Sequence, residues 1–293
     1  MNFLSSNKVF ISHISINEFD RIYEEIIIAL ISAFNKIGID VRLSKNTFDD
    51  DCLNILVGST IFASRHLNLQ QKLKHKKFLI YQLEPLHEEF GLLKNFPEYY
   101  ELLKASNWIW DYSPQSKSFL NSSGINHVSF LPPSYDDSLE KYSPDSAQDI
   151  DIIFTGSPHP RRTVILDQLK ALGYNVIGLS QIFGRERDYF TSRSKIVLNI
   201  HAWDNINNLE TIRISYLLAN KSFVISENSD HNPYGSGLIF ASYNDLVEIC
   251  VKWLKKERHE RDSVAIEGYE NNKKILMTDQ IKLALNEINL ATK

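Results

Sequence analysis

The sequence has few cysteines, no long apolar run and no strong excess of charge of either sign. Its two cysteines, Cys52 and Cys250, lie far apart without metal-ligand spacing, which indicates a reducing compartment and no disulfide framework. The densest apolar stretch, 25–34, is too short to cross a bilayer, and no basic segment with a long apolar run after it opens the chain. We therefore expect a cytoplasmic protein without a transmembrane segment. Peripheral association with the inner face of the membrane stays open.

The charge balance and the composition exclude several classes of function. A formal net charge of −4 gives no reason to expect a nucleic-acid partner. No Walker loop and no complete Gly-x-Gly-x-x-Gly motif occurs, which argues against kinases and ordinary dehydrogenases. Hydrophobic residues make up 43% of the chain, which is typical of a globular protein, and 293 residues are enough for two domains.

Strand-like and helix-like segments alternate along most of the chain. In the first half we predict strands over 8–12, 39–43, 53–57, 78–81, 108–110 and 128–131, and helices over 17–37, 97–105 and 115–122. In the second half we predict strands near 150–154, 175–179, 195–200, 222–226 and 237–240, with helices between them. This alternation is typical of parallel sheets covered on both faces, which bind ligands at the carboxyl ends of their strands.

A segment rich in Pro, Ser, Asp and Tyr, 134–148, interrupts the alternation, and we interpret it as a linker. It separates a predicted Rossmann-like domain over 1–133 from a second one over 149–262. The remaining residues, 263–293, form a predicted helical segment that can pack back on the first domain. Two such domains facing each other would enclose a cleft between strand ends and helix N-termini.

The strongest functional signal lies where the strand 150–154 ends. The strand is followed by the loop Thr-Gly-Ser-Pro-His-Pro-Arg-Arg, and a helical pattern over 163–172 begins at once. Backbone N–H groups and two guanidinium groups therefore meet at a helix N-terminus, where the macrodipole favours anions. Two arginines here could be solvated charges, but cations oppose the dipole unless an anion is present. We predict a diphosphate site that uses Gly156, Ser157, Arg161 and Arg162.

Further candidates follow along the second domain. Lys195 opens a predicted strand and could contact the diphosphate or only solvent. His201 ends the same strand, where a cleft would begin, although a structural histidine fits equally. Glu210 and Arg213 are spaced i, i+3 and could pair with each other. A helix that begins near residue 208 would instead direct both toward the ligand.

The first domain offers candidate catalytic residues for an acceptor hydroxyl. Glu84 follows the strand 78–81, and Asp111 follows the strand 108–110. Carboxylates at such positions seldom lack a partner or a task, so either could orient a hydroxyl or act as general base. The alternative for each is a hydrogen-bonded structural acid. His13 follows the first strand and is a further candidate base.

Several of these segments together resemble one known family. They are YQLEPL (81–86), WDYSP (110–114), FTGS (154–157), SKIVLNIH (194–201), LETIR (209–213) and VISE (224–227). This series is similar to the CgeB/YkvP-type glycosyltransferases, and the resemblance extends over about residues 78–250. It implies the α/β GT-B fold, with two Rossmann-like domains whose parallel sheets face a central cleft.

The resemblance also implies an activity. A nucleotide-sugar donor would be held mainly by the C-terminal domain, and a saccharide or lipid-linked acceptor by the N-terminal domain. No metal or other cofactor is expected, because basic residues and helix dipoles would stabilise the leaving diphosphate. Asp149 and Asp151 match a manganese-binding Asp-x-Asp pattern, but they enter a strand at its start, the wrong end for a ligand site. The resemblance further implies a role in bacterial surface-polysaccharide biosynthesis.

Some features of the reaction stay open. Many transferases of this fold grip the donor ribose with a Glu before the last core strand. If Asn220 replaces the Gly that precedes this strand, that position holds Ser215, and Glu210 or Arg213 could substitute. The nucleotide base, the sugar, the acceptor, the stereochemical course and the oligomeric state are not specified. A nucleotide-sugar epimerase and a non-catalytic scaffold of the same fold remain alternatives.

Overall fold

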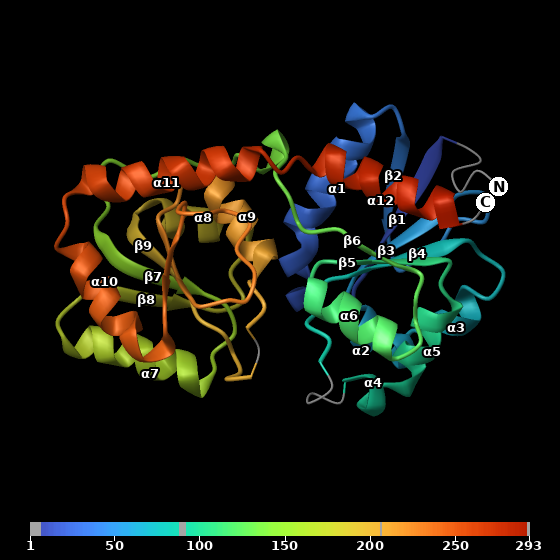
Figure 1. Ribbon diagram of the computed structural model, residues 1–293, viewed down its shortest axis with the longest axis horizontal. Coiled ribbons are helices and arrows are strands. Elements are labelled where there is room, and N and C mark those ends of the chain that lie inside the picture. Colours follow the sequence, from blue (N-terminus) through green and yellow to red (C-terminus); the bar gives the residue numbers. More distant parts are fainter. Residues whose placement is uncertain (1–6, 88–91, 206, 292–293) are drawn as a thin grey trace. The chain divides into compact units, whose positions relative to one another are not determined.

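The computed structural model describes residues 7–87, 92–205 and 207–291 and divides the chain into two compact units. Unit 1 comprises residues 1–134 and 277–293, and unit 2 comprises residues 135–276. Each unit is built on one parallel sheet with helices on both faces (Figure 1). The predicted α/β class is therefore confirmed. Within the described ranges, none of the helices combines the length and the apolar character that a membrane span requires.

The sheet of unit 1 has the strand order β2-β1-β3-β4-β5-β6, and all neighbouring strands are parallel. Its strands are β1 (Lys8–Ile14), β2 (Asp40–Lys45), β3 (Leu53–Gly58), β4 (Phe78–Gln82), β5 (Trp108–Asp111) and β6 (Val128–Phe130). Its helices are η1 (Glu18–Tyr23), α1 (Glu24–Lys36), α2 (Thr60–His66), α3 (Leu69–Lys72), α4 (Leu92–Asn95), α5 (Pro97–Ala105), α6 (Pro114–Ser122) and α12 (Met277–Ala291). Helices α1 and α12 lie on one face of the sheet, and α2, α3, α5 and α6 lie on the other (Figure 1).

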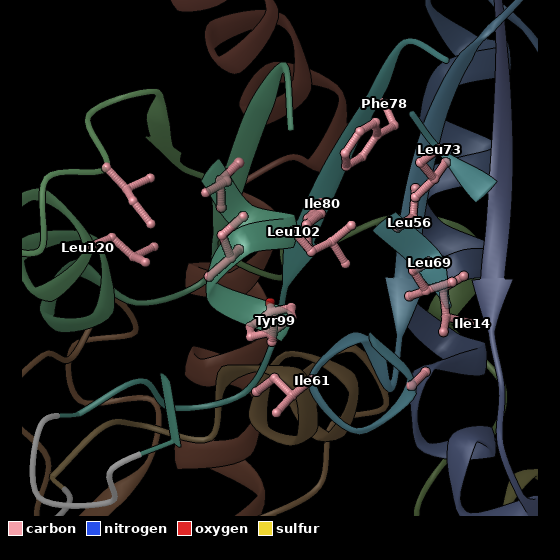
Figure 2. Packing of buried hydrophobic residues seen from close by; sticks show 14 of the residues in the cluster. Ile14, Leu56, Ile61, Leu69, Leu73, Phe78, Ile80, Tyr99, Leu102 and Leu120 are labelled. Carbon is pink, nitrogen blue, oxygen red and sulfur yellow. The ribbon is translucent and has the colours of Figure 1, made fainter. Parts of the chain in front are cut away.

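The core of unit 1 explains why its strands are almost continuously apolar. Figure 2 shows strand residues such as Ile14, Leu56 and Ile80 beside side chains from the α2–α6 face, among them Ile61 and Leu102. A strand covered by helices on both faces buries its odd and even positions alike. Each fully buried Leu or Ile stabilises the fold by about 1.5–3 kcal/mol relative to an exposed one.

The sheet of unit 2 has the strand order β11-β10-β9-β7-β8 and is also parallel throughout. Its strands, close to their predicted positions, are β7 (Ile150–Thr155), β8 (Val176–Leu179), β9 (Ser194–Asn199), β10 (Val224–Glu227) and β11 (Ile239–Ala241). Its helices are η3 (Asp137–Leu139), α7 (Pro160–Ala171), α8 (Gly184–Ser192), α9 (Thr211–Ala219), η4 (Tyr243–Asp245), α10 (Leu246–Leu254) and α11 (Arg258–Lys273). Helices α7 and α10 cover one face, and α8, α9 and α11 cover the other (Figure 1).

The strand orders identify one switch point in each sheet. In unit 2 the chain runs from β7 outward to β8 and then returns to β9 on the other side of β7. In unit 1 it runs from β1 to β2 and then crosses to β3. The connections leave a switch point in opposite directions, so a crevice opens at the carboxyl ends of the two strands and commonly binds ligands. The carboxyl ends of the β7/β9 and β1/β3 strand pairs are therefore the expected positions of ligand sites.

The segments predicted to lie outside the two domains are divided between the units. Most of the predicted linker, 134–148, belongs to unit 2. There the Asn220 side-chain oxygen accepts hydrogen bonds from the backbone N–H groups of Lys141 at 2.6 Å and Tyr142 at 2.9 Å. The predicted helical segment 263–293 contains the end of α11, which packs on α9 in unit 2, and α12, which packs on α1 in unit 1.

Two glycines allow α11 to pack closely on the loop that precedes β11. A Cβ atom on Gly268 would lie 2.3 Å from the carbonyl oxygen of Gly237 and 2.8 Å from a methyl group of Leu218. A Cβ atom on Gly237 would lie 2.2 Å from Cα of Gly268. Neither position can therefore carry a side chain unless the backbone moves.

We predict that Gly268→Ala destabilises the protein, although alanine is the better helix former by about 1 kcal/mol. The added methyl group meets backbone atoms that cannot rotate away, and such overpacking costs about 1–3 kcal/mol. Denaturant unfolding of the variant measures the effect. Ser263→Ala, at an exposed position of the same helix, is the matched control and should not lower stability. A Gly268→Ala variant at least as stable as the wild type would contradict the close contact.

Candidate functional site

The loop between β7 and α7 lies at the switch point of unit 2. The backbone N–H of Gly156 donates a hydrogen bond to the Leu179 carbonyl at 2.9 Å, which fixes the loop at the end of the sheet. A Cβ atom on Gly156 would lie 3.2 Å from a terminal nitrogen of Arg213. The glycine thus allows a guanidinium group from α9 to approach the backbone of the loop.

Two arginines from different helices meet behind this loop. Arg162 donates hydrogen bonds to the carbonyl oxygens of Ile200 and Ser157, both at 2.9 Å. Arg213 donates to the side-chain oxygen of Asn199 at 2.6 Å. Their guanidinium carbons lie 5.1 Å and 5.7 Å from the centre of the Phe154 ring. Each cation is therefore held by neutral oxygens and an aromatic face.

The electrostatics of this pair are unfavourable without a ligand. Arg162 is 7% exposed, and its burial, with the positive charge of Arg213 beside it, lowers its pKa to about 10. Burial also lowers the pKa of Arg213. In the described part of the chain neither guanidinium forms an ion pair, and Glu210 supplies the favourable charge that acts on both. Both guanidinium groups are protonated at neutral pH. A bound anion would therefore offset the free-energy cost of burying their positive charges.

Arg161 is arranged differently from its neighbour. It forms a two-pronged ion pair with Glu227, with nitrogen–oxygen distances of 3.0 Å and 2.7 Å. Its Nε atom contacts the Asp204 carboxylate, and its guanidinium carbon lies 4.0 Å from the centre of the Tyr243 ring. The hydrogen bonds that Arg161 donates to the Glu227 carboxylate raise the pKa of Arg161. Its charge is thus already matched, and it holds the strand ends together.

His201 lies at the centre of this cluster. Its backbone N–H donates to Glu227 at 3.0 Å, and its carbonyl oxygen accepts from Arg161 at 3.0 Å. Its Nε2 atom lies 2.9 Å from the carbonyl oxygen of Asn228, so we assign the proton of the neutral ring to Nε2. The buried Nδ1 atom is then a hydrogen-bond acceptor, and it has no partner among the described residues. Because Nδ1 is enclosed, the contacts that the structure shows for His201 are those that hold the strand ends together.

Glu210 stands at the N-terminal end of α9, one residue before its first turn. Within the described ranges its carboxylate accepts no hydrogen bond, although it acts electrostatically on Arg162 and Arg213. Ser215, which is predicted to replace the ribose-binding Glu if Asn220 replaces the Gly, is buried, and its hydroxyl donates to Asn272 at 3.3 Å. Of these two residues, the structure thus leaves Glu210 available for a ligand.

Lys195 does not join this cluster. Its ammonium group pairs with Asp151 at 2.7 Å, and both residues lie near the amino ends of their strands. Asn199 and His201 lie at the other end of β9. We therefore leave Lys195 out of the site, because the length of the strand separates it from the other candidates.

Two residues of the cluster were absent from the predicted set. Glu227 ends β10 and binds both Arg161 and the backbone of His201. Asn199 ends β9 and accepts from Arg213. A polar residue directly after an apolar run is the sequence signal: it places Glu227 at the border of the donor pocket, and the same signal could have identified Asn199.

The catalytic candidates of unit 1 lie in different surroundings. The Glu84 carboxylate accepts a hydrogen bond from the Tyr23 hydroxyl, and its carbonyl oxygen accepts from Gln82 at 2.6 Å. His13 lies on β1 and is 5% exposed. Asp111 is fully enclosed, at 0% exposure, with one carboxyl oxygen bound to the backbone N–H of Ser113 at 2.9 Å. An acceptor cannot touch an enclosed carboxyl, so the structure favours the structural alternative for Asp111.

We predict that Asp111→Asn stabilises the protein at neutral pH. Burial raises the pKa of Asp111 well above its usual value, so the folded state favours the protonated form. The stability that protonated Asp111 contributes is fully present below the pKa that this residue has in the unfolded chain. It is lost as pH rises through the pKa that Asp111 has in the folded protein. Asn cannot ionise, so the variant should be more stable than the wild type at pH 7.

Unfolding at two pH values measures this effect. The difference between Asp111→Asn and the wild type should vanish at about pH 3.5, where the unfolded aspartate is itself largely protonated. The exposed Asp40→Asn is the matched control and should change stability little at either pH. A destabilised Asp111→Asn variant at pH 7 would show that the carboxylate form is needed.

Solved structures with the same two-domain arrangement are glycosyltransferases and related proteins. Anabaena HepE, solved with UDP and glucose, aligns over 96% of this chain and 99% of its own at 11% identity, with a TM-score of 0.63. The N-terminal domain of a Candida albicans trehalose-6-phosphate phosphatase aligns over 97% of both chains at 9% identity, with a TM-score of 0.62. A variant of S. aureus TarM, solved with UDP, aligns over 81% of this chain and 55% of its own at 11% identity, with a TM-score of 0.58. The chain thus has the GT-B fold.

Sequence comparison leads to a viral family. No protein-family model matches the chain, so membership of the CgeB/YkvP-type family stays a prediction. The uncharacterised protein L140 of Acanthamoeba polyphaga mimivirus is 28% identical over 58% of this chain and 59% of its own length. The uncharacterised protein R358 of the same virus is 30% identical over 243 residues, which are 73% of this chain and 85% of R358. The chain therefore belongs to the same protein family as mimivirus R358.

Proposed function

We propose that this protein is a glycosyltransferase that transfers a sugar from a nucleotide-sugar donor, and that it binds the donor diphosphate with Arg162 and Arg213. One observation carries the proposal: the guanidinium groups of Arg162 and Arg213 share the face of Phe154, and within the described ranges neither donates a hydrogen bond to a carboxylate. Such a pair is costly in the empty protein and favourable once an anion binds.

A diphosphate matches this arrangement better than a single carboxylate does. It carries negative charge on two adjacent groups, which suits two guanidinium groups that arise from different helices. The N-terminus of α7 and the backbone of the β7–α7 loop add partial positive charge at the same strand ends. HepE and TarM, which share the fold, were solved with UDP, and this supports a uridine nucleotide as the first donor to test.

The same groups would serve the reaction. When the glycosidic bond breaks, its electron pair stays on the leaving diphosphate oxygen, where positive charge lowers the barrier. Arg162 and Arg213 would supply that charge, and we propose that no metal ion is required. The Glu210 carboxylate would accept hydrogen bonds from the ribose hydroxyls. His201 would act from behind the donor, by holding Arg161 and Glu227 at the strand ends.

The acceptor side of the proposal rests on unit 1. Glu84, held by Tyr23, is the candidate base for a saccharide or lipid-linked hydroxyl, and His13 stays a further candidate. The expected part in bacterial surface-polysaccharide synthesis has no support among the relatives described above, which are viral.

We predict that UDP raises the melting temperature of the protein and that Arg162→Met removes this effect. A ligand at about one hundred times its Kd stabilises a protein by about 2.7 kcal/mol, which corresponds to a shift of a few degrees. Loss of two charge-assisted hydrogen bonds should weaken nucleotide binding about 100-fold. The empty variant should melt close to the wild type, because methionine fills similar space without a buried charge.

The panel should also contain GDP, ADP, dTDP and CMP, so that the test does not depend on the base. Lys195→Met is the matched control, because it removes a cation from the opposite end of the same sheet and should leave nucleotide binding intact. A wild-type protein that responds to none of these nucleotides would contradict the proposal. Release of an isomerised sugar without any acceptor would show an epimerase instead.

A further inference from the structure

Unit 1 contains a cavity of about 580 Å³ beyond the ends of β1 and β2. Its lining residues are polar or charged with one exception: Ser15, Ile16, Asn17, Arg21, Glu24 and Lys45. It opens next to β1, one of the two strands that flank the switch point of this sheet. The cavity therefore lies at the carboxyl edge of this sheet, where parallel sheets commonly bind ligands, on the β2 side of β1.

The wall of the cavity is held in place by Asn46. The Asn46 side chain accepts a hydrogen bond from the backbone N–H of Ser15 at 2.9 Å and donates one to its carbonyl oxygen at 2.7 Å. Asn46 has a φ of 52°, in the left-handed region that asparagine tolerates better than most residues. The loop after β1 is thus fixed in the protein without a ligand.

The charge on the lining is positive. Lys45 and Arg21 carry two positive charges, and Glu24 carries one negative charge. Arg21 pairs with Glu24 at 3.0 Å, but both side chains are largely exposed, so this pair contributes little and can rearrange at small cost. Lys45 forms no ion pair with any residue in the described ranges. An anionic group that enters the cavity would therefore find an uncompensated ammonium and a guanidinium nearby.

The cavity is also connected to the candidate base. Tyr23 lies in sequence between the lining residues Arg21 and Glu24, and its hydroxyl donates to the Glu84 carboxylate. Lys45, the last residue of β2, is in register with His13 on β1. Glu84 and His13 are not among the lining residues, but each is linked to the cavity through one neighbour: Glu84 through the Tyr23 hydroxyl, and His13 through its pairing with Lys45.

We propose that this cavity binds the acceptor and that the acceptor is an anionic saccharide. Its phosphate or carboxylate group contacts Lys45 and Arg21, and its hydroxyl groups contact Ser15, Asn17 and Glu24. This assignment rests on the proposed transferase function, because it names the acceptor class of the same reaction. It does not depend on the arginine pair of unit 2.

Calorimetric titration of the full chain tests the proposal. The probes are glucose 6-phosphate, glucuronate, glucose and inorganic phosphate, each titrated at low and at moderate salt. We expect at least one anionic sugar to bind about tenfold or more tighter than glucose and inorganic phosphate, with an affinity that falls as salt rises. Lys45→Ala should weaken this binding about tenfold, because it removes the uncompensated charge. Binding of only one anionic sugar would support the proposal and identify the charged group.

Lys8→Ala is the matched control, because Lys8 is an exposed lysine at the amino end of β1, the opposite edge of the same sheet. It should bind the anionic sugar as the wild type does. The proposal is overturned if glucose binds as tightly as the anionic sugars, if inorganic phosphate does, or if Lys45→Ala binds normally.

UDP titrated into the same samples separates the two proposals. If UDP binds and no anionic sugar does, the acceptor assignment fails and the transferase function stands. If an anionic sugar binds through Lys45 and no nucleotide binds, the transferase function fails and the site in unit 1 stands.

Discussion

The arrangement of unit 2 depends on keeping two like charges together in a largely enclosed place. Arg162 and Arg213 come from different helices, repel each other and lose most of their hydration. Among the described residues their hydrogen-bond and ring partners are all neutral: two backbone carbonyl groups, the Asn199 amide and the face of Phe154. The Glu210 carboxylate acts on them without a hydrogen bond. A glycine at position 156 leaves the space for this approach. Burial of these two cations therefore destabilises the protein before any ligand binds, and a ligand with negative charge offsets this destabilisation.

The end of β9 organises most of these contacts. Three consecutive residues contribute to them: Asn199 receives Arg213, the carbonyl oxygen of Ile200 receives Arg162, and that of His201 receives Arg161. The matched pair of Arg161 and Glu227 joins β10 and α7 to the same place. One arginine of the Arg-Arg sequence thus has a structural role, which leaves the charge of the other uncompensated. Arg161 therefore stabilises the strand ends, and its neighbour Arg162 is the residue proposed to bind an anion.

The parts of the fold that could be predicted from sequence are those governed by local pattern. Strands covered on both faces are apolar runs, and a Gly-Ser-Pro loop before a helix is visible without knowing its neighbours. The roles of Arg161 and Arg162 could not be separated, because Glu227 lies far along the chain and reaches Arg161 only through the order of the strands. The position of Lys195 at the start of β9 was visible in the sequence and already places it at the amino end of the sheet, but its partner Asp151 on the adjacent strand was not. The enclosure of Asp111 and the contact between Gly237 and Gly268 likewise depend on packing between distant segments.

The discontinuous path of the chain has a consequence for its synthesis on the ribosome. Helix α12 belongs to unit 1, where it packs on α1, yet the whole of unit 2 lies between it and β6. The chain enters unit 2 at Tyr135 and leaves it at Leu276, and these two residues are paired side by side. Unit 2 can therefore be completed while one face of the first sheet still lacks a helix. During translation the part of this face that α12 covers, beside α1, must stay exposed or be covered by a chaperone until α12 emerges.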